Sequence, residues 1–183
     1  MKATVAEVAA EVAALNPRLT VEKLMANVEV DPADPSRVVG DLCWGDVRVL
    51  PDSIGSLTVG GNLLLYRNQL ASLPEGFGSL TVGHDLCLND NQLASLPDDF
   101  GYLTVGRDLS LSNNRLVSLP EGFGSLSVEG DLYLTSNQLA SLPEGFGSLT
   151  VGGDVNLSRN PIAAELHPGS FAGLALVVEE DDY

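Results

Sequence analysis

Four aspartates recur every 23 residues, and they are the first side chains whose spacing could do chemistry: Asp85, Asp108, Asp131 and Asp154. Asp41 and Asn62 hold the same position in the two preceding copies. If the copies stack as neighbouring strands, these carboxylates lie about 5 Å apart and repel by roughly 0.8 kcal/mol per pair in water. Hydrogen bonds from backbone amides and hydroxyls could compensate, or a row of hard cations such as Ca²⁺ could. We favour the hydrogen bonds and expect no cofactor, because the chain has no EF-hand loop and no nonapeptide calcium repeat.

Other reactive side chains are few. Of the two histidines, His84 takes a turn position that other copies fill with Gly or Arg, and His167 lies where the repeat pattern drifts. Gly169-Ser170-Phe171 lacks the GxSxG order of a nucleophile elbow. The two cysteines, Cys43 and Cys87, can form neither a disulfide framework nor a CxxC metal site. The sequence therefore predicts a protein that is not an enzyme.

Charge and hydropathy exclude further classes. There are 25 acidic and 9 basic side chains, which gives a formal charge of −16. Such a surface repels nucleic-acid phosphates and acidic lipid headgroups, so we expect neither as a partner. No apolar run approaches the roughly 20 residues of a membrane span, and acidic residues interrupt the first segment where a signal peptide would be apolar. We expect a cytoplasmic monomer.

The aspartates belong to a longer internal repeat. Four consecutive copies of 23 residues are nearly identical, beginning with SLTVGGNLLLYRNQLASLPEGFG at Ser56, and a fifth starts at Ser148 and drifts after Asn160. A degenerate copy precedes them and is about two residues short between Leu42 and Leu50. Their LxLxxNxLxxLP core, carried in the first full copy by Leu63, Leu65, Asn68, Leu70, Leu73 and Pro74, resembles leucine-rich repeat proteins.

That resemblance implies a right-handed α/β repeat solenoid, rich in β-structure, with a parallel sheet on its concave side. Period-2 alternation independently places Leu63 and Leu65 inside and Leu64 and Tyr66 outside. Two further columns should stack inside the solenoid as structural elements, Asn68, Asn91, Asn114, Asn137 and Asn160 on one side, and Phe77, Phe100, Phe123 and Phe146 on the other. One departure from the usual pattern leaves the subclass open: a V-G-G or V-G-D type stretch (Val59, Gly60, Gly61) replaces a leucine before the strand, which predicts a tight turn with glycine at positive φ.

Three regions are expected along the chain. Residues 1–30 form an N-terminal helical cap, with a helix over 4–15 opened by a Thr4/Glu7 capping box and a second short helix near 21–28. Residues 36–178 form the solenoid, with about five full repeats and degenerate ends, and residues 179–183 form an acidic tail. The cap is needed because an open solenoid exposes its core and a sheet edge.

Function should come from positions that vary between the copies. The resemblance implies a protein-binding module that uses its concave face, with a protein partner of unknown identity. The variable outward residues chosen for that face are Cys43, Leu64, Tyr66, Arg67, Cys87, Asn89, Tyr133, Asn156 and Arg159. The alternative is a structural protein that is stabilised by cations through the aspartates, or that binds ice or another surface through the Ser/Thr columns such as Ser56-x-Thr58.

Overall fold

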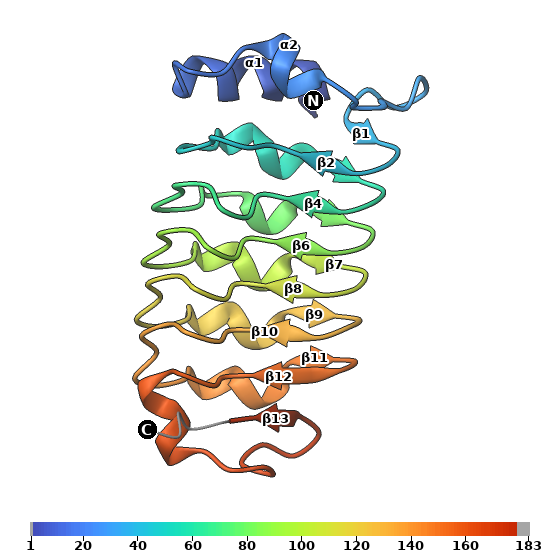
Figure 1. The fold of residues 1–183 in the computed structure, drawn as a ribbon. Helices are drawn as coiled ribbons and strands as arrows, with labels where there is room; N and C mark the ends of the chain where they lie inside the picture. The colour runs from blue at the N-terminus through green and yellow to red at the C-terminus, as the bar shows by residue number, and fades with distance from the viewer. Residues whose placement is uncertain (1, 179–183) are drawn as a thin grey trace.

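The computed structural model describes residues 2–178, and the acidic tail expected over 179–183 lies outside the described residues. The chain winds into a stack of coils with the two α-helices over its N-terminal end (Figure 1). Within the described part, no helix is long and apolar enough to span a bilayer.

Two parallel sheets run along the stack. The seven-stranded sheet has the order β13-β12-β10-β8-β6-β4-β2. Its strands are β2 (Leu42–Cys43), β4 (Leu63–Leu64), β6 (Leu86–Cys87), β8 (Leu109–Ser110), β10 (Leu132–Tyr133), β12 (Asp154–Asn156) and β13 (Ala175–Val177). This is the predicted parallel sheet, and the leucine-rich repeat solenoid predicted from the sequence is confirmed.

A second parallel sheet was not expected. It has six strands: β1 (Arg37–Val38), β3 (Thr58–Val59), β5 (Thr81–Val82), β7 (Thr104–Val105), β9 (Ser127–Val128) and β11 (Thr150–Val151). From β3 to β11 each strand is a Thr-Val or Ser-Val pair, in which the valine faces the core and the hydroxyl residue faces outward, whereas β1 is an Arg-Val pair. Both residues of the Thr-Val pairs are β-branched, which favours extended backbone.

Between the two sheets each coil passes through one turn of 3₁₀-helix. These turns are η1 (Asp52–Ser56), η2 (Phe77–Ser79), η3 (Asp98–Tyr102), η4 (Glu121–Ser125), η5 (Glu144–Ser148) and η6 (Pro161–Glu165). From η2 to η5 they bury the predicted phenylalanine column, whose rings stack nearly parallel with centroids 6.0–6.3 Å apart. Phe171 closes the column with a ring tilted by 56°.

The predicted asparagine column lies inside the solenoid, where it forms a hydrogen-bond ladder. In Asn114, Nδ2 donates to the carbonyls of Leu88 and Leu111, both at 3.0 Å, and Oδ1 accepts from the backbone N–H of Leu93 at 3.0 Å. The other members repeat this pattern, and we call Asn68, Asn91, Asn114, Asn137 and Asn160 the Asn ladder. Each member satisfies buried backbone groups of its own coil and of the coil before it.

The cap consists of α1 (Val5–Leu15) and α2 (Val21–Met25). The capping box between Thr4 and Glu7 is present, so the predicted start of the first helix is confirmed. The second helix ends at Met25 rather than near 28, and Leu24 is its buried residue. Trp44, in the first coil and only 2% exposed, donates its indole N–H to the Leu24 carbonyl at 2.9 Å, which joins α2 to the solenoid.

The predicted reason for the glycines before the strand is wrong. Neither Gly60 nor Gly61 has positive φ. Instead, a Cβ at Gly60 would overlap the Val39 carbonyl, and a Cβ at Gly61 would overlap Asp41 Oδ1 of the preceding coil. Glycine suits these positions because successive turns stack in contact, although His84, Arg107 and Glu129 take them in other coils. The constraint is close approach rather than backbone conformation.

Candidate binding surface

The variable residues of the seven-stranded sheet lie in one row. The register pairs Cys43 with Leu64, Leu64 with Cys87, Cys87 with Ser110, and then continues through Tyr133 to Asn156. We call these six residues the outward row. Cys43 is exposed and the other members are partly exposed, while the leucine before each lies in the core.

The N-terminal part of the outward row is apolar. Cys43, Leu64 and Cys87 come from three neighbouring strands, β2, β4 and β6. Tyr66, two residues after Leu64 on the same side of the chain, is 42% exposed. Both cysteines are free thiols, and burial together with the charges of Asp85 and Asp108 raises the pKa of the Cys87 thiol. Cys87 therefore contributes apolar surface rather than a reactive thiolate.

Beside this apolar part lies a polar cluster built on Asp90. Asn89 and Asn113 donate their Nδ2 groups to the two Asp90 carboxylate oxygens at 2.8 and 3.0 Å. Arg67 places Nε 3.8 Å from Asp90 Oδ2 and keeps 79% of its side chain exposed. Arg67 and Asn89, predicted independently from their columns, are thus brought together through a residue that was not predicted.

The residue at the Arg67 position has left-handed backbone in each of the six coils that contain β2 to β12 of the seven-stranded sheet. The φ values lie between 52° and 62° for Asp46, Arg67, Asp90, Asn113, Ser136 and Arg159. Asp and Asn tolerate this conformation, whereas it costs more for Arg and Ser. In the full copies the next residue is a member of the Asn ladder, whose side chain must enter the core, so the chain turns sharply at this position. The turn is what aims the side chains of Arg67 and Arg159 away from the core.

The C-terminal part of the outward row is already engaged within the protein. The Tyr133 hydroxyl donates to Asp131 Oδ2 at 2.7 Å, which raises the pKa of Tyr133 to about 12 and, with the Asp154 backbone N–H, lowers the pKa of Asp131. Asn156 accepts from the backbone N–H of Ser158 at 3.0 Å. The predicted site residues therefore divide into an apolar half near the cap and a hydrogen-bonded half further along.

The aspartates predicted as possible metal ligands form a hydrogen-bond ladder. One side-chain oxygen of each of its members from Asp41 to Asp131, a carboxylate oxygen except for the amide oxygen of Asn62, accepts from the backbone N–H of the equivalent residue in the next coil, at 2.7–3.2 Å. We call Asp41, Asn62, Asp85, Asp108, Asp131 and Asp154 the Asp ladder. The bond is 2.7–2.8 Å where a glycine precedes the donor, and 3.0–3.2 Å where His84 or Arg107 does. Where His84 or Arg107 stands before the donor residue, the acceptor oxygen of the preceding coil therefore lies slightly further from the backbone N–H.

Two members of the Asp ladder line an open hollow of about 370 Å³. Asp85 and Asp108 share it with Arg107 and Glu129, so a cationic side chain already stands among the carboxylates. Among residues 2–178, no three His, Cys, Asp or Glu side chains are grouped as a metal site.

The hydroxyl residues of the alternative function lie on the second sheet. Thr58, Thr81, Thr104, Ser127 and Thr150 are in register along β3 to β11. They form a row on the outer side of that sheet, away from the outward row.

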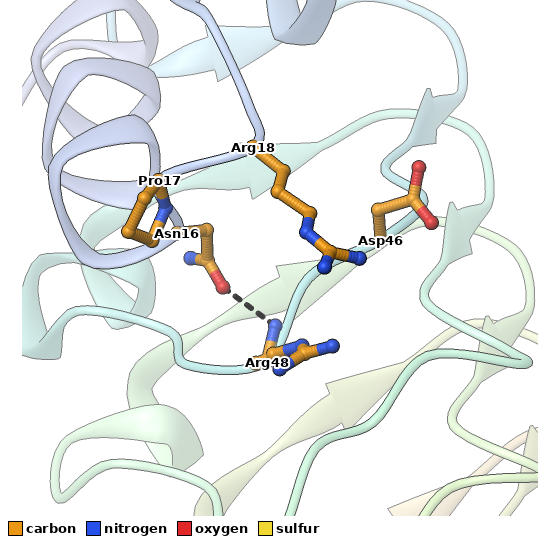
Figure 2. Close-up of a pocket in the computed structure, with 5 residues that line it drawn as sticks. All are labelled: Asn16, Pro17, Arg18, Asp46 and Arg48. Atoms are coloured by element: carbon orange, nitrogen blue, oxygen red, sulfur yellow. Dashed lines mark hydrogen bonds between the residues drawn. The ribbon is translucent and has the colours of Figure 1, made fainter.

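A pocket at the junction of cap and first coil was missed from the sequence. Asn16, Pro17, Arg18, Asp46 and Arg48 line it, and its volume is about 180 Å³ (Figure 2). Asn16 is 3% exposed, and its Oδ1 accepts from the backbone N–H of Arg48 at 2.6 Å. We call these five residues the cap pocket.

The sequence feature that could have predicted the cap pocket is the degenerate first copy, which is two residues short. Val47 N donates to Asn68 Oδ1 as Leu70 N does to Asn91 Oδ1, so Val47 takes the Leu70 position. The two absent residues are therefore the ladder asparagine and the residue after it. Asn16 of the cap supplies a substitute side chain for this coil.

Comparison with known proteins gives one family match, because residues 107–126 match the Leucine Rich Repeat family. No significant match was found among curated proteins. The structure of an LRR protein of Leptospira interrogans is similar, with 30% sequence identity, a TM-score of 0.49, and coverage of 66% of this chain and 36% of that one. This chain thus spans about a third of that protein's length.

Proposed function

The chain is a leucine-rich repeat protein, and from that premise we propose that it is a non-catalytic module that binds a protein partner. The contact surface is the N-terminal half of the outward row, Cys43, Leu64 and Cys87, together with Tyr66 and Arg67. The observation that carries the proposal is the register of three apolar residues, one exposed and two partly exposed, on adjacent strands beside a tyrosine that is 42% exposed.

Several physical features support this surface over others. Tyrosine and arginine are enriched among residues that dominate binding energy, and both stand here next to apolar side chains. The strands that present them are anchored by core leucines and by the Asn ladder, so little conformational freedom is lost on binding. The formal charge of −16 disfavours nucleic acid and acidic membranes as the partner.

The test is a double substitution, Leu64→Asp with Tyr66→Ala. Both side chains lie outside the core, so the variant should keep its fold. Loss of a desolvated tyrosine and burial of a new charge should weaken binding at least about a hundredfold. Proteins captured from an extract by wild type but not by the variant are identified, purified and titrated directly.

The chain offers a matched control. Val117→Asp with Tyr102→Ala makes the same kinds of change at residues that are 54% and 76% exposed and lie off the seven-stranded sheet. Binding of the purified partner should survive in this control. Equal binding by wild type and by the Leu64/Tyr66 variant would remove the proposed surface.

A second candidate is a structural protein that binds a regular surface through the hydroxyl row. The register of Thr58, Thr81, Thr104, Ser127 and Thr150 along one sheet favours it. Thr81→Tyr with Thr104→Tyr would block that row without touching the outward row. Ice recrystallisation inhibited by wild type and not by this variant would support the second candidate.

A further inference from the structure

The cap pocket gathers positive charge on a strongly acidic protein. Arg18 and Arg48 point their guanidinium groups into the same space (Figure 2). Within residues 2–178, neither group is paired with a carboxylate, although the chain has 25 acidic residues. The pocket's own carboxylate, Asp46, is instead held by Lys23 Nζ at 3.0 Å.

We propose that the cap pocket binds a carboxylate, supplied by a Glu or Asp side chain in an acidic segment of a protein partner. This inference deepens the proposed function and rests on it for the identity of the partner as a protein. Guanidinium groups donate paired hydrogen bonds that match the two oxygens of a carboxylate. Because Lys23 offsets the charge of Asp46, Arg18 and Arg48 leave a local charge of +2, which carboxylates of an acidic segment complement.

The size of the pocket favours one side chain. Its volume of about 180 Å³ lies below the range of roughly 300–1,000 Å³ that is usual for small-molecule sites. Pro17 adds an apolar wall against which the methylene groups of a glutamate can pack.

The pocket is also built rather than incidental. It exists because the first coil lacks two residues, and Asn16 fills part of that gap with four hydrogen bonds to the backbone of α1 and the first coil. Asp46 occupies in its coil the place that Arg67 occupies in the next one. A partner lying along Tyr66 and Arg67 would therefore reach the cap pocket by continuing toward the cap.

The experiment is a titration of the full chain with a short blocked peptide, acetyl-Ala-Glu-Glu-Ala-amide, followed by amide NMR. At 0.15 M salt the Debye length of about 8 Å limits repulsion from the remaining acidic surface. The Arg48 and Val49 amides, which donate to Asn16 Oδ1, report directly on the pocket. We expect saturable shifts at these amides, with a dissociation constant on the order of 1 mM.

Variants and probes make the result specific. Arg18→Gln and Arg48→Gln should each weaken peptide binding about tenfold, since each removes a charge-assisted hydrogen bond. Arg107→Gln with Arg115→Gln removes two exposed positive charges elsewhere and should leave binding unchanged. The peptide acetyl-Ala-Gln-Gln-Ala-amide should give no saturable shift.

Three outcomes would overturn the inference: equal binding of the glutamine peptide, undiminished binding by both pocket variants, or tighter binding of inorganic phosphate than of the glutamate peptide. The last would mean a free-anion site. The proposed function is tested separately, because the Leu64/Tyr66 variant should still bind the glutamate peptide while losing the partner. Failure of the peptide alone removes the pocket inference, and failure of the partner assay alone removes the proposed surface.

Discussion

Replacing Asn16 by alanine should detach the cap from the solenoid more than it disturbs the solenoid itself. Asn16 Nδ2 donates to the carbonyls of Val12 at 2.7 Å and Val49 at 2.8 Å. Its Oδ1 accepts from the N–H groups of Arg48 and Val49 at 2.6 and 3.2 Å. No other cap side chain makes this many hydrogen bonds to the first coil among the contacts of the described residues.

The expected cost can be worked from these bonds. The Val12 carbonyl keeps the Asn16 backbone N–H as a partner at 3.0 Å, so its loss counts for little. Three groups of Arg48 and Val49 lose their partner, at about 1 kcal/mol each when water cannot replace it. Val49 is 47% exposed and water can reach it, so we expect about 2 kcal/mol in the unfolding of the cap.

The assay uses the single tryptophan of the chain. Trp44 is buried against α2, so its fluorescence reports cap docking, while far-UV circular dichroism reports the sheets. In urea, Asn16→Ala should move the fluorescence transition to lower concentration and move the dichroism transition less, because coils contact mainly their neighbours.

Asn114→Ala is the matched comparison in the middle of the solenoid. It removes four hydrogen bonds from a side chain that is 8% exposed, and should shift both signals together. The reasoning is refuted if Asn16→Ala leaves the Trp44 transition within about 0.5 kcal/mol of wild type, a surface-like value. It is also refuted if both variants displace the two signals equally.

Three other outcomes follow from the structure. Gly101→Ala should lower the unfolding free energy by about 2–3 kcal/mol in urea, because each of the four nearly identical copies has glycine at this position and the new Cβ would overlap the backbone carbonyl of Gly122 in the next coil. Gly40→Ala, whose Cβ meets nothing within 4 Å, should change it by less than about 0.5 kcal/mol, and equal effects would contradict close approach between coils as the constraint. Tyr133 should ionise near pH 12 in an absorbance titration, so its hydrogen bond to Asp131 stabilises the fold below about pH 10 and loses that effect as the pH rises toward 12. Tyr133→Phe should remove this late ionisation and raise the pKa of Asp131. If the late ionisation persisted in the variant, it would belong to another tyrosine. Millimolar Ca²⁺ should leave the calorimetric melting temperature unchanged relative to chelator, because the Asp ladder is already hydrogen-bonded, and a rise would favour the cation alternative.

The regular features of the fold could be predicted because each copy has the same residue types at the same spacing. The Asn and Phe columns and the inward leucines follow from spacing alone, and all of them lie where spacing puts them. The second sheet was missed because each of its strands contributes a single inward valine and so shows no alternation, whereas Leu63-x-Leu65 places two inward leucines at one strand of the predicted sheet. The role of Gly61 was wrongly predicted because close approach between coils cannot be seen in one copy of the sequence.

Site residues were harder for a related reason. The outward row follows from period 2, but whether a side chain in it is available depends on which hydrogen-bond partners the folded chain places beside it. The Tyr133 hydroxyl is hydrogen-bonded to Asp131, two residues before it, whereas the residue two before Tyr66 is the apolar Leu64, and Tyr66 stays 42% exposed. Sequence columns therefore give position, and only the packed structure shows which polar atoms are already used.

The departures from the repeat are where this molecule acquires chemistry of its own. A perfect array would give every coil the same acidic surface, since the acids are copied with the repeat. The first coil differs because it lacks the ladder asparagine, and Asn16 of the cap makes hydrogen bonds to that coil instead. Arg18 follows two residues after Asn16 and therefore lies near Arg48 in the cap pocket. The next coil adds Tyr66 and Arg67, which no other copy repeats together. Positive charge and apolar surface thus meet at the N-terminal end, so a partner with acidic and apolar side chains should be held there and not along the rest of the stack.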